Sequence, residues 1–226
     1  PVRICSVAAA EKEISSCLAE NVNILAISDD AFPPRLKHID DAPPLLFVLG
    51  NTRLLKKKAV AVIGSRNAST HGLRIAHKMA SDLGLSGMLV VSGMARGIDA
   101  AAHKGALNTG TVAVVGGGVD VIYPQENADL HEQIRDRGVI VSEMPLGTRP
   151  KAAHFPRRNR IISGISRGIV VVEAAPRSGS LITARLALEQ GRDVFAVPGA
   201  ALDPRARGTN DLIRQGAILT ESARDV

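Results

Sequence analysis

The feature that most constrains the fold is a series of six short apolar runs, rich in β-branched residues, that begins at residue 59. The runs occupy residues 59–64, 88–93, 111–118, 138–143, 168–174 and 193–199. Helical patterns lie between most of them, as at 73–84, 95–107 and 128–138. Near-continuous apolar strands that alternate with amphipathic helices are typical of a parallel sheet covered on both faces. The sequence therefore predicts an α/β fold of the Rossmann-like, doubly wound class, with a mainly parallel sheet.

The first 55 residues have a different pattern. A helix-like stretch at 11–22 is followed by a segment with paired prolines, which favour extended or turning backbone. We expect a helix-plus-loop appendage over residues 1–55, packed on a Rossmann-like domain over residues 56–226. No apolar run is as long as the roughly 18 residues of a membrane span, and the first residues lack a signal-peptide pattern. We therefore expect a cytoplasmic protein without membrane contact, in which Cys5 and Cys17 are ordinary thiols.

The net charge of +6 is unevenly distributed along the chain. Residues 42–81 contain seven Lys or Arg and no acid, and residues 144–172 contain six Lys or Arg and no acid. Together these two tracts carry +13, so the rest of the chain carries −7. A tract without internal counter-charge favours a polyanionic partner if the two tracts meet in space. The second tract holds three clustered arginines, Arg157, Arg158 and Arg160, although a cluster of this kind is also consistent with a solvated charge run.

Unusual loops follow the first five predicted strands. Their sequences are GSRNAST, SGMARGID, GGGVDVIYP, SEMP and EAAPRSGSLITA. In parallel sheets, ligands bind beyond the carboxyl ends of the strands, and glycine-rich turns that open helices expose N–H groups suited to phosphate. We expect Arg66, Arg96 and the arginine cluster to line one basic rim at this edge.

Enzymatic interpretations find little support in the loops. The first strand is not followed by G-x-G-x-x-G, and the chain lacks Gly-Lys-Ser/Thr, so neither a dinucleotide nor an ATP cofactor is expected. No His or Cys spacing indicates a metal, and Ser65 and Ser180 lack an obvious His partner. Asp99 could pair with His103 one helical turn away and anchor the second loop, with catalysis as the alternative. Glu143 and Glu173 could act in the cleft, but we favour a role in holding arginine side chains.

The loops and the segments around them contain the motifs IGSRNASTHG, VVSGMARGIDAAAH, GGGVDVIYPQEN, SEMPLG, FPRRNRIISGIS, VVVEAAPRSGSLITARLALEQGRDVFAVPG and GTNDLIRQGA. Taken together, these motifs resemble the DprA/Smf family of bacterial DNA-processing proteins over about residues 25–221. The resemblance implies an extended Rossmann fold that binds single-stranded DNA, protects incoming strands during natural transformation and loads the RecA recombinase. It implies a homodimer formed through the Rossmann domain, no cofactor and no enzymatic activity. Many members also carry an N-terminal sterile-alpha-motif-like domain, whose end residues 1–55 would contain, and a C-terminal winged helix.

The resemblance also implies which residues form the DNA site. They are Gly64, Ser65, Arg66, Arg96, Phe155, Arg157, Arg158, Asn159, Ser178, Gly179 and Ser180. Arginine suits phosphate because it presents a planar fork of donors, and an aromatic ring suits single strands because every base has a face to stack on. Phe155, which we expect in a basic loop between His154 and Pro156, is the favoured stacking platform, with core packing as the alternative. For Tyr123 the two roles stay equally open.

The rival class is a nucleotide-processing enzyme related to the phosphoribohydrolases. Those enzymes resemble this chain in their glycine-rich loops but carry P-G-G-x-G-T-x-x-E. The corresponding loop here, residues 176–184, reads PRSGSLITA and has Ala184 near the place of the acid. This difference favours binding without turnover.

Overall fold

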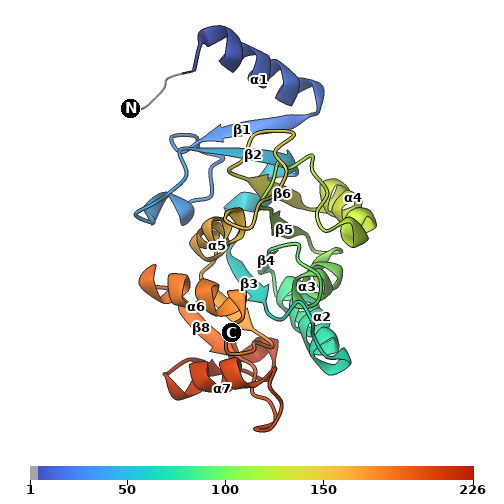
Figure 1. Ribbon diagram of the computed structural model, residues 1–226, viewed down its shortest axis with the longest axis vertical. Coiled ribbons are helices and arrows are strands. Elements are labelled where there is room, and N and C mark those ends of the chain that lie inside the picture. The colour runs from blue at the N-terminus through green and yellow to red at the C-terminus, as the bar shows by residue number, and fades with distance from the viewer. Residues whose placement is uncertain (1–4) are drawn as a thin grey trace.

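The computed structural model describes residues 5–226, in which nine strands form one sheet with helices on both faces (Figure 1). The strands are β1 (Val22–Ala26), β2 (Leu45–Gly50), β3 (Ala59–Ile63), β4 (Leu89–Ser92), β5 (Thr111–Val114), β6 (Val139–Ser142), β7 (Gly168–Val171), β8 (Asp193–Ala196) and β9 (Ile218–Leu219). Their order across the sheet is β1-β2-β6-β5-β4-β3-β7-β8-β9. Strands β3 to β9 pair in parallel, whereas β1 and β2 are antiparallel. The predicted doubly wound, mainly parallel class is confirmed.

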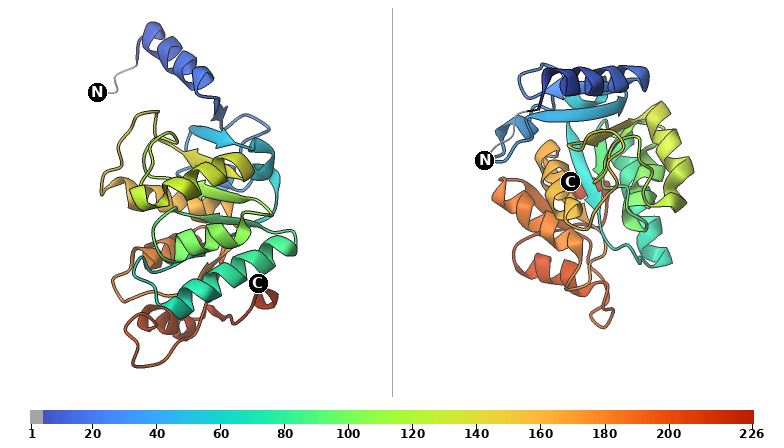
Figure 2. Two further views of the ribbon diagram at one scale, coloured as in Figure 1. Left: turned by 90° about the vertical axis from the view of Figure 1, so that its right-hand side faces the viewer. Right: turned by 45° about the horizontal axis from the view of Figure 1, so that its top comes forward.

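Two sets of helices cover the sheet. The helices are α1 (Val7–Ala19), α2 (Thr70–Leu85), α3 (Ile98–Ala106), α4 (Ala128–Arg137), α5 (His154–Ile165), α6 (Gly179–Glu189) and α7 (Arg207–Arg214). Short 3-10 helices span Leu36–His38, Thr52–Lys56, Gln125–Asn127 and Ala223–Asp225. Helices α5 and α6 pack on one face, and α2, α3 and α4 lie on the other, with α2 and α3 side by side (Figure 2). Among the described residues, no helix combines the length and apolar character that a membrane crossing needs.

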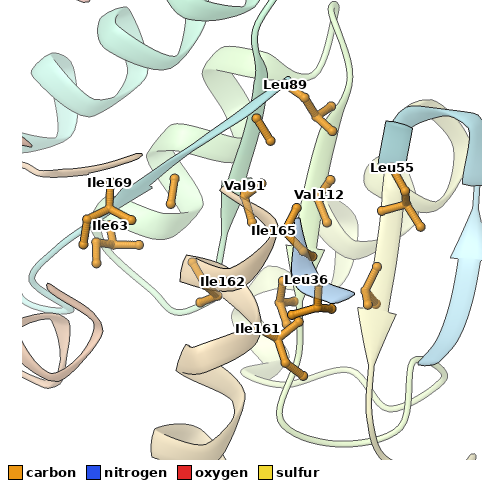
Figure 3. Close-up of a cluster of buried hydrophobic side chains, with 14 of the residues drawn as sticks. Leu36, Leu55, Ile63, Leu89, Val91, Val112, Ile161, Ile162, Ile165 and Ile169 are labelled. Carbon is orange, nitrogen blue, oxygen red and sulfur yellow. The ribbon is translucent and has the colours of Figure 1, made fainter. Parts of the chain in front are cut away.

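The core explains why the parallel strands were predictable. All five residues of β3 are buried, and the central strands β4, β5, β6 and β7 are buried at every position. One face of these strands packs against Ile161, Ile162 and Ile165 of α5, next to Leu36 and Leu55 from the N-terminal part (Figure 3). A strand buried on both faces must be apolar throughout, which produces the continuous runs seen in the sequence.

The N-terminal part differs from the expected helix-plus-loop appendage. The expected helix is present as α1, but residues 22–50 also contribute β1 and β2, and β2 pairs with β6 of the main sheet. Leu36 and Leu46 belong to the same core cluster as Ala61 and Val112. The paired prolines lie outside the two strands, where the missing N–H groups interrupt no ladder. The segment is thus an antiparallel extension of the sheet.

The order of the strands reverses between β3 and β7. From β3 the chain moves through β4, β5 and β6 in one direction, then returns through α5 to β7 on the other side of β3. The loops that leave β3 and β7 therefore diverge to opposite sides of the sheet and open a crevice at its carboxyl edge, the usual ligand position in such folds.

Candidate functional site

The crevice at the strand reversal brings together most of the residues implicated by sequence. A cavity of about 800 Å³ there is lined by Gly64, Ser65, Arg66, Phe155, Arg158, Asn159, Ser178, Gly179 and Ser180, among others. A Cβ atom on Gly64 would lie 2.8 Å from Ile98 Cγ1 and 2.9 Å from the carbonyl oxygen of Glu173, so this turn requires glycine. Ser178 caps α6, and the Asn159 amide donates to the carbonyl of Gly179 at 3.4 Å, which joins the two sides of the crevice.

An aromatic ring and a guanidinium group meet at the centre of the crevice. The Arg66 Cζ atom lies 5.3 Å from the centre of the Phe155 ring, within cation–π range. Phe155 also contacts Tyr123, with ring centres 5.6 Å apart and planes inclined by 36°. A second cavity of about 290 Å³ is lined by both rings together with Arg66, Arg96 and Arg158. Phe155 is half-buried and Tyr123 is half exposed, so both rings are accessible from the crevice.

The arginine cluster does not form a loop, as the sequence suggested, but belongs to the first turns of α5. At 3.6 residues per turn, consecutive arginines point in different directions. Arg158 is buried and donates from Nη1 to the carbonyl of Val114 at 2.8 Å. Burial lowers its pKa to about 10, opposed by the charge of Asp99, so Arg158 remains cationic at neutral pH.

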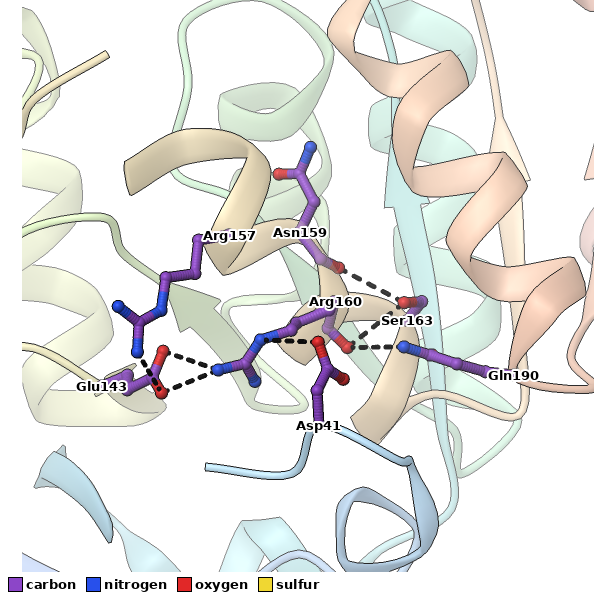
Figure 4. Close-up of polar contacts among 7 residues, drawn as sticks. All are labelled: Asp41, Glu143, Arg157, Asn159, Arg160, Ser163 and Gln190. Atoms are coloured by element: carbon purple, nitrogen blue, oxygen red, sulfur yellow. Dashed lines mark hydrogen bonds and ion pairs between the residues drawn. The ribbon is translucent and has the colours of Figure 1, made fainter. Parts of the chain in front are cut away.

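The other two arginines turn away from the crevice toward Glu143 (Figure 4). Arg160 Nη2 contacts the Glu143 carboxylate at 2.7 and 2.8 Å, and Arg160 Nε pairs with Asp41 at 3.2 Å. Arg157, with 59% of its side chain exposed, pairs with the same carboxylate at 3.1 Å. Arg158, although buried, lines both cavities that Phe155 lines, whereas Arg157 and Arg160 line neither. Of the three arginines, only Arg158 therefore lies where the basic rim was expected.

The basic residues of the first tract, residues 42–81, lie at opposite edges of the sheet. Lys56, Lys57 and Lys58 precede β3 at its amino end, whereas Arg66 follows its carboxyl end. Parallel strands place these ends on opposite edges of the sheet. Of the basic residues in this tract, only Arg66 lines the crevice, together with Arg96 from the loop after β4, which lines the smaller cavity.

The candidate acid and base groups have structural partners. Asp99 Oδ2 accepts from the N–H groups of Gly93 at 3.2 Å and Ala95 at 3.4 Å, so its predicted role in anchoring the second loop is confirmed. His103 bonds to the Thr111 hydroxyl at 2.8 Å rather than to Asp99, and burial lowers the pKa of His103 to about 3. Burial raises the pKa of Asp99, opposed by Arg158.

The two glutamates differ from each other. Glu143 holds arginines, as predicted, whereas Glu173 instead accepts from the Ser69 N–H at 3.0 Å and the Ser69 hydroxyl at 2.5 Å. Glu173 thereby fixes the start of α2. Within residues 5–226 no cluster of three or more His, Cys, Asp or Glu side chains is placed to hold a metal ion.

Comparison with known proteins identifies the family. The family model for DNA recombination-mediator protein A matches residues 23–226. The chain belongs to this family. DNA processing protein DprA of Streptococcus pneumoniae is 48% identical over 203 residues, which cover 89% of this chain and 72% of that protein. Protein Smf of Escherichia coli is 45% identical over 219 residues, covering 95% of this chain but only 59% of that protein.

Solved structures of family members have the same fold. The X-ray structure of DprA from S. pneumoniae matches with a TM-score of 0.91 and 45% identity, covering 98% of this chain and 77% of that one. A DprA structure from Helicobacter pylori, described as showing a single-stranded DNA binding mode, matches with a TM-score of 0.82 and 29% identity over 90% of this chain and 93% of that one. The molybdenum cofactor binding protein of Rippkaea orientalis, at 17% identity and a TM-score of 0.54, shares the fold alone.

Proposed function

We propose that the crevice at the strand reversal binds single-stranded DNA. The observation that carries this proposal is the placement of the Arg66 guanidinium over the Phe155 ring, where the two cavities meet. Arg66 is exposed and offers a fork of donors to a phosphate, while Phe155 and Tyr123 offer faces to unstacked bases. The single-stranded DNA binding mode described for the H. pylori relative supports the same ligand.

The chemistry of the site favours single strands over duplex. Bases in a duplex are stacked on one another and cannot present their faces to a ring half-buried in a crevice. The Gly179 N–H at the start of α6 adds a donor for phosphate, whereas the N–H groups of Ser178 and Ser180 already donate to the Ala175 carbonyl and the Ser178 hydroxyl. Binding would therefore combine one stacking contact with charge-assisted contacts to the backbone.

The family suggests a wider role, which we propose for the whole protein. The protein would protect incoming strands during natural transformation, load the RecA recombinase onto them and act as a homodimer without cofactor or catalysis. A pull-down of RecA by the strand-bound protein tests the loading step. Binding without turnover is supported by Ala184, which is buried where an acid would be needed, and by Glu173, which is engaged by Ser69. Release of base from nucleoside monophosphates that Glu173→Gln abolishes would contradict this part.

The test of strand binding separates stacking from charge. Fluorescence anisotropy with labelled single- and double-stranded oligonucleotides would compare wild type, Phe155→Ala and Arg66→Gln at several salt concentrations. Phe155→Ala removes a stacking contact of about 1–3 kcal/mol, so affinity should fall roughly 5- to 150-fold while its salt dependence stays the same. Arg66→Gln should weaken binding and also reduce the slope of log K against log salt by about 0.7, because one phosphate contact is lost.

The matched control is Lys57→Gln, which removes the same charge at the opposite edge of the sheet. It should leave both the affinity and the slope close to wild type. Equal affinity of the wild type for duplex and single strands, or wild-type binding by folded Phe155→Ala and Arg66→Gln proteins, would overturn the proposal.

A further inference from the structure

A second basic groove begins at the edge of the crevice. It has a volume of about 1090 Å³ and runs between α2 and α3, helices that lie side by side in Figure 2. Arg66 lines this groove and also both cavities of the crevice, and Arg96 lines the groove and the smaller cavity. The groove is therefore continuous with the crevice and leads away from Phe155.

The two helices contribute different side chains to the groove. Thr70, Arg74, His77 and Lys78 of α2 are spaced so that they share one face of the helix. The facing stripe of α3 consists of small residues that end in Lys104. The helices approach closely here, because a Cβ atom on Gly105 would lie 2.2 Å from the carbonyl oxygen of His77. The groove is thus lined by small residues of α3 and by long cationic side chains, mainly of α2.

The charge of the groove is strongly one-sided. Among residues 5–226, five Lys or Arg side chains line it, against one carboxylate, that of Glu126. Lys78 is paired with Asp82 at 2.8 Å, but within residues 5–226 Arg74, Arg96 and Lys104 form no ion pair. Arg74 and Lys104 are both exposed. Unpaired cations of this kind, in a row beside a nucleic-acid site, fit an extended polyanion.

We propose that a single strand bound in the crevice continues past Arg66 and Arg96 into the α2–α3 groove, where Arg74 and Lys104 contact its phosphates. This inference rests on the proposed function of the crevice. From Thr70 to Lys78 the helix rises about 12 Å, which gives room for roughly three phosphates at the 3.4 Å spacing of a stacked strand. Within residues 5–226 no Phe, Tyr or Trp lines the groove, and its only rings are the imidazoles of His71 and His77, so we expect contacts mainly with the backbone.

The experiment compares two lengths of labelled oligothymidylate, about 5 and about 20 nucleotides, binding to the full chain. The double variant Arg74→Gln/Lys104→Gln should bind the short strand within about twofold of wild type, since a short strand occupies only the crevice. The long strand should lose about tenfold in affinity, and its salt slope should fall by about 1.4, because two phosphate contacts are removed. The double variant Lys56→Gln/Lys57→Gln, with the same loss of charge at the opposite edge, should match wild type with both strands.

The outcomes distinguish the groove from the crevice. If the wild type fails to bind the short strand and Phe155→Ala leaves binding of the long strand unchanged, the proposed function itself is wrong. If the short strand binds but the Arg74→Gln/Lys104→Gln protein keeps wild-type affinity for the long strand, only the groove inference is overturned. Equal losses with both strands would also overturn it, because they would indicate a general effect of charge rather than contacts along a path. Thermal unfolding checks that both double variants are folded, as expected for exposed positions.

Discussion

Replacing Glu143 by Gln should destabilise the protein without weakening its binding to single strands. The Glu143 carboxylate is 12% exposed and accepts from Arg157 and from Arg160, whose own side chain is 8% exposed. Removing one partner of a buried ion pair typically costs about 3–5 kcal/mol, because the other charge is left buried. Arg160 keeps Asp41 at 3.2 Å, and the amide oxygen of Gln can still accept one hydrogen bond. We therefore expect a loss of about 2–3 kcal/mol in the free energy of unfolding.

Urea and thermal denaturation followed by circular dichroism measure this loss. In a chain of 226 residues, 1 kcal/mol corresponds to about 2–4 °C, so the melting temperature should fall by roughly 4–12 °C. The matched control is Glu189→Gln, which removes an exposed acid paired with Arg185 at 3.5 Å on α6. Exposed pairs contribute at most about 1 kcal/mol, so the control should change little.

Strand binding by the Glu143→Gln protein tests the division of the arginine cluster. Arg157 and Arg160 point away from Phe155, so freeing them from Glu143 should leave affinity for short single strands within about threefold of wild type. A wild-type melting temperature combined with a tenfold gain in affinity would refute the reasoning. That result would mean that these two arginines are DNA ligands held back by Glu143, and not parts of the scaffold.

Three further predictions concern acid stability, the turn of the site and assembly. Between pH 6.5 and about 3 the folded chain keeps His103 neutral while the unfolded chain protonates it, so stability is lost as pH falls, by about 2 kcal/mol at pH 5. Urea titrations at pH 7 and pH 5 should show a smaller acid loss for His103→Gln. Gly97→Ala places a Cβ atom 2.3 Å from the Ser65 carbonyl at a φ of 79°, so denaturation should show a loss of more than about 1 kcal/mol, and anisotropy weaker strand binding. Light scattering should show a homodimer, and a monomer at high micromolar concentration would contradict this.

The central strands could be predicted because a strand that is buried on both faces has an uninterrupted run of apolar residues. All six apolar runs became strands, from β3 to β8. The remaining strands have weaker signatures, since β9 has two residues and β2 lies just after the proline pair at 43–44. Helix α5 was missed because Pro156 indicated a loop. Proline is tolerated in the first turn of a helix, where its missing N–H would have no partner.

The sequence predicted many of the residues that line the site, but not how their side chains are arranged. The loop after β3 and the start of α6 meet at the crevice because the strand order reverses there, which the family pattern could indicate. The roles of the arginines depend on which face of α5 each occupies and on partners far along the chain, such as Asp41 for Arg160. The absence of acidic residues within a stretch of sequence therefore does not show whether acidic residues from elsewhere in the chain lie beside it in the fold. The cationic face of α2 could be recognised in the sequence from the i, i+4 spacing of its residues. Lys104 belongs to the neighbouring helix α3, and only the fold shows that it lies beside this face.

The distribution of acids, more than the number of arginines, determines where a strand can be held. Glu143 and Asp41 neutralise Arg157 and Arg160, and Asp99 lies with Arg158 against Gly93. Within residues 5–226 the crevice is left with three exposed guanidinium groups that form no ion pair, those of Arg66, Arg96 and Arg177, and with one pair of aromatic rings in contact. Such a site holds only a few nucleotides, because each stacking or phosphate contact engages one nucleotide. If affinity continues to rise for strands longer than the crevice can hold, the additional nucleotides must contact unpaired cations outside the crevice. The α2–α3 groove, which begins at the edge of the crevice, provides such cations.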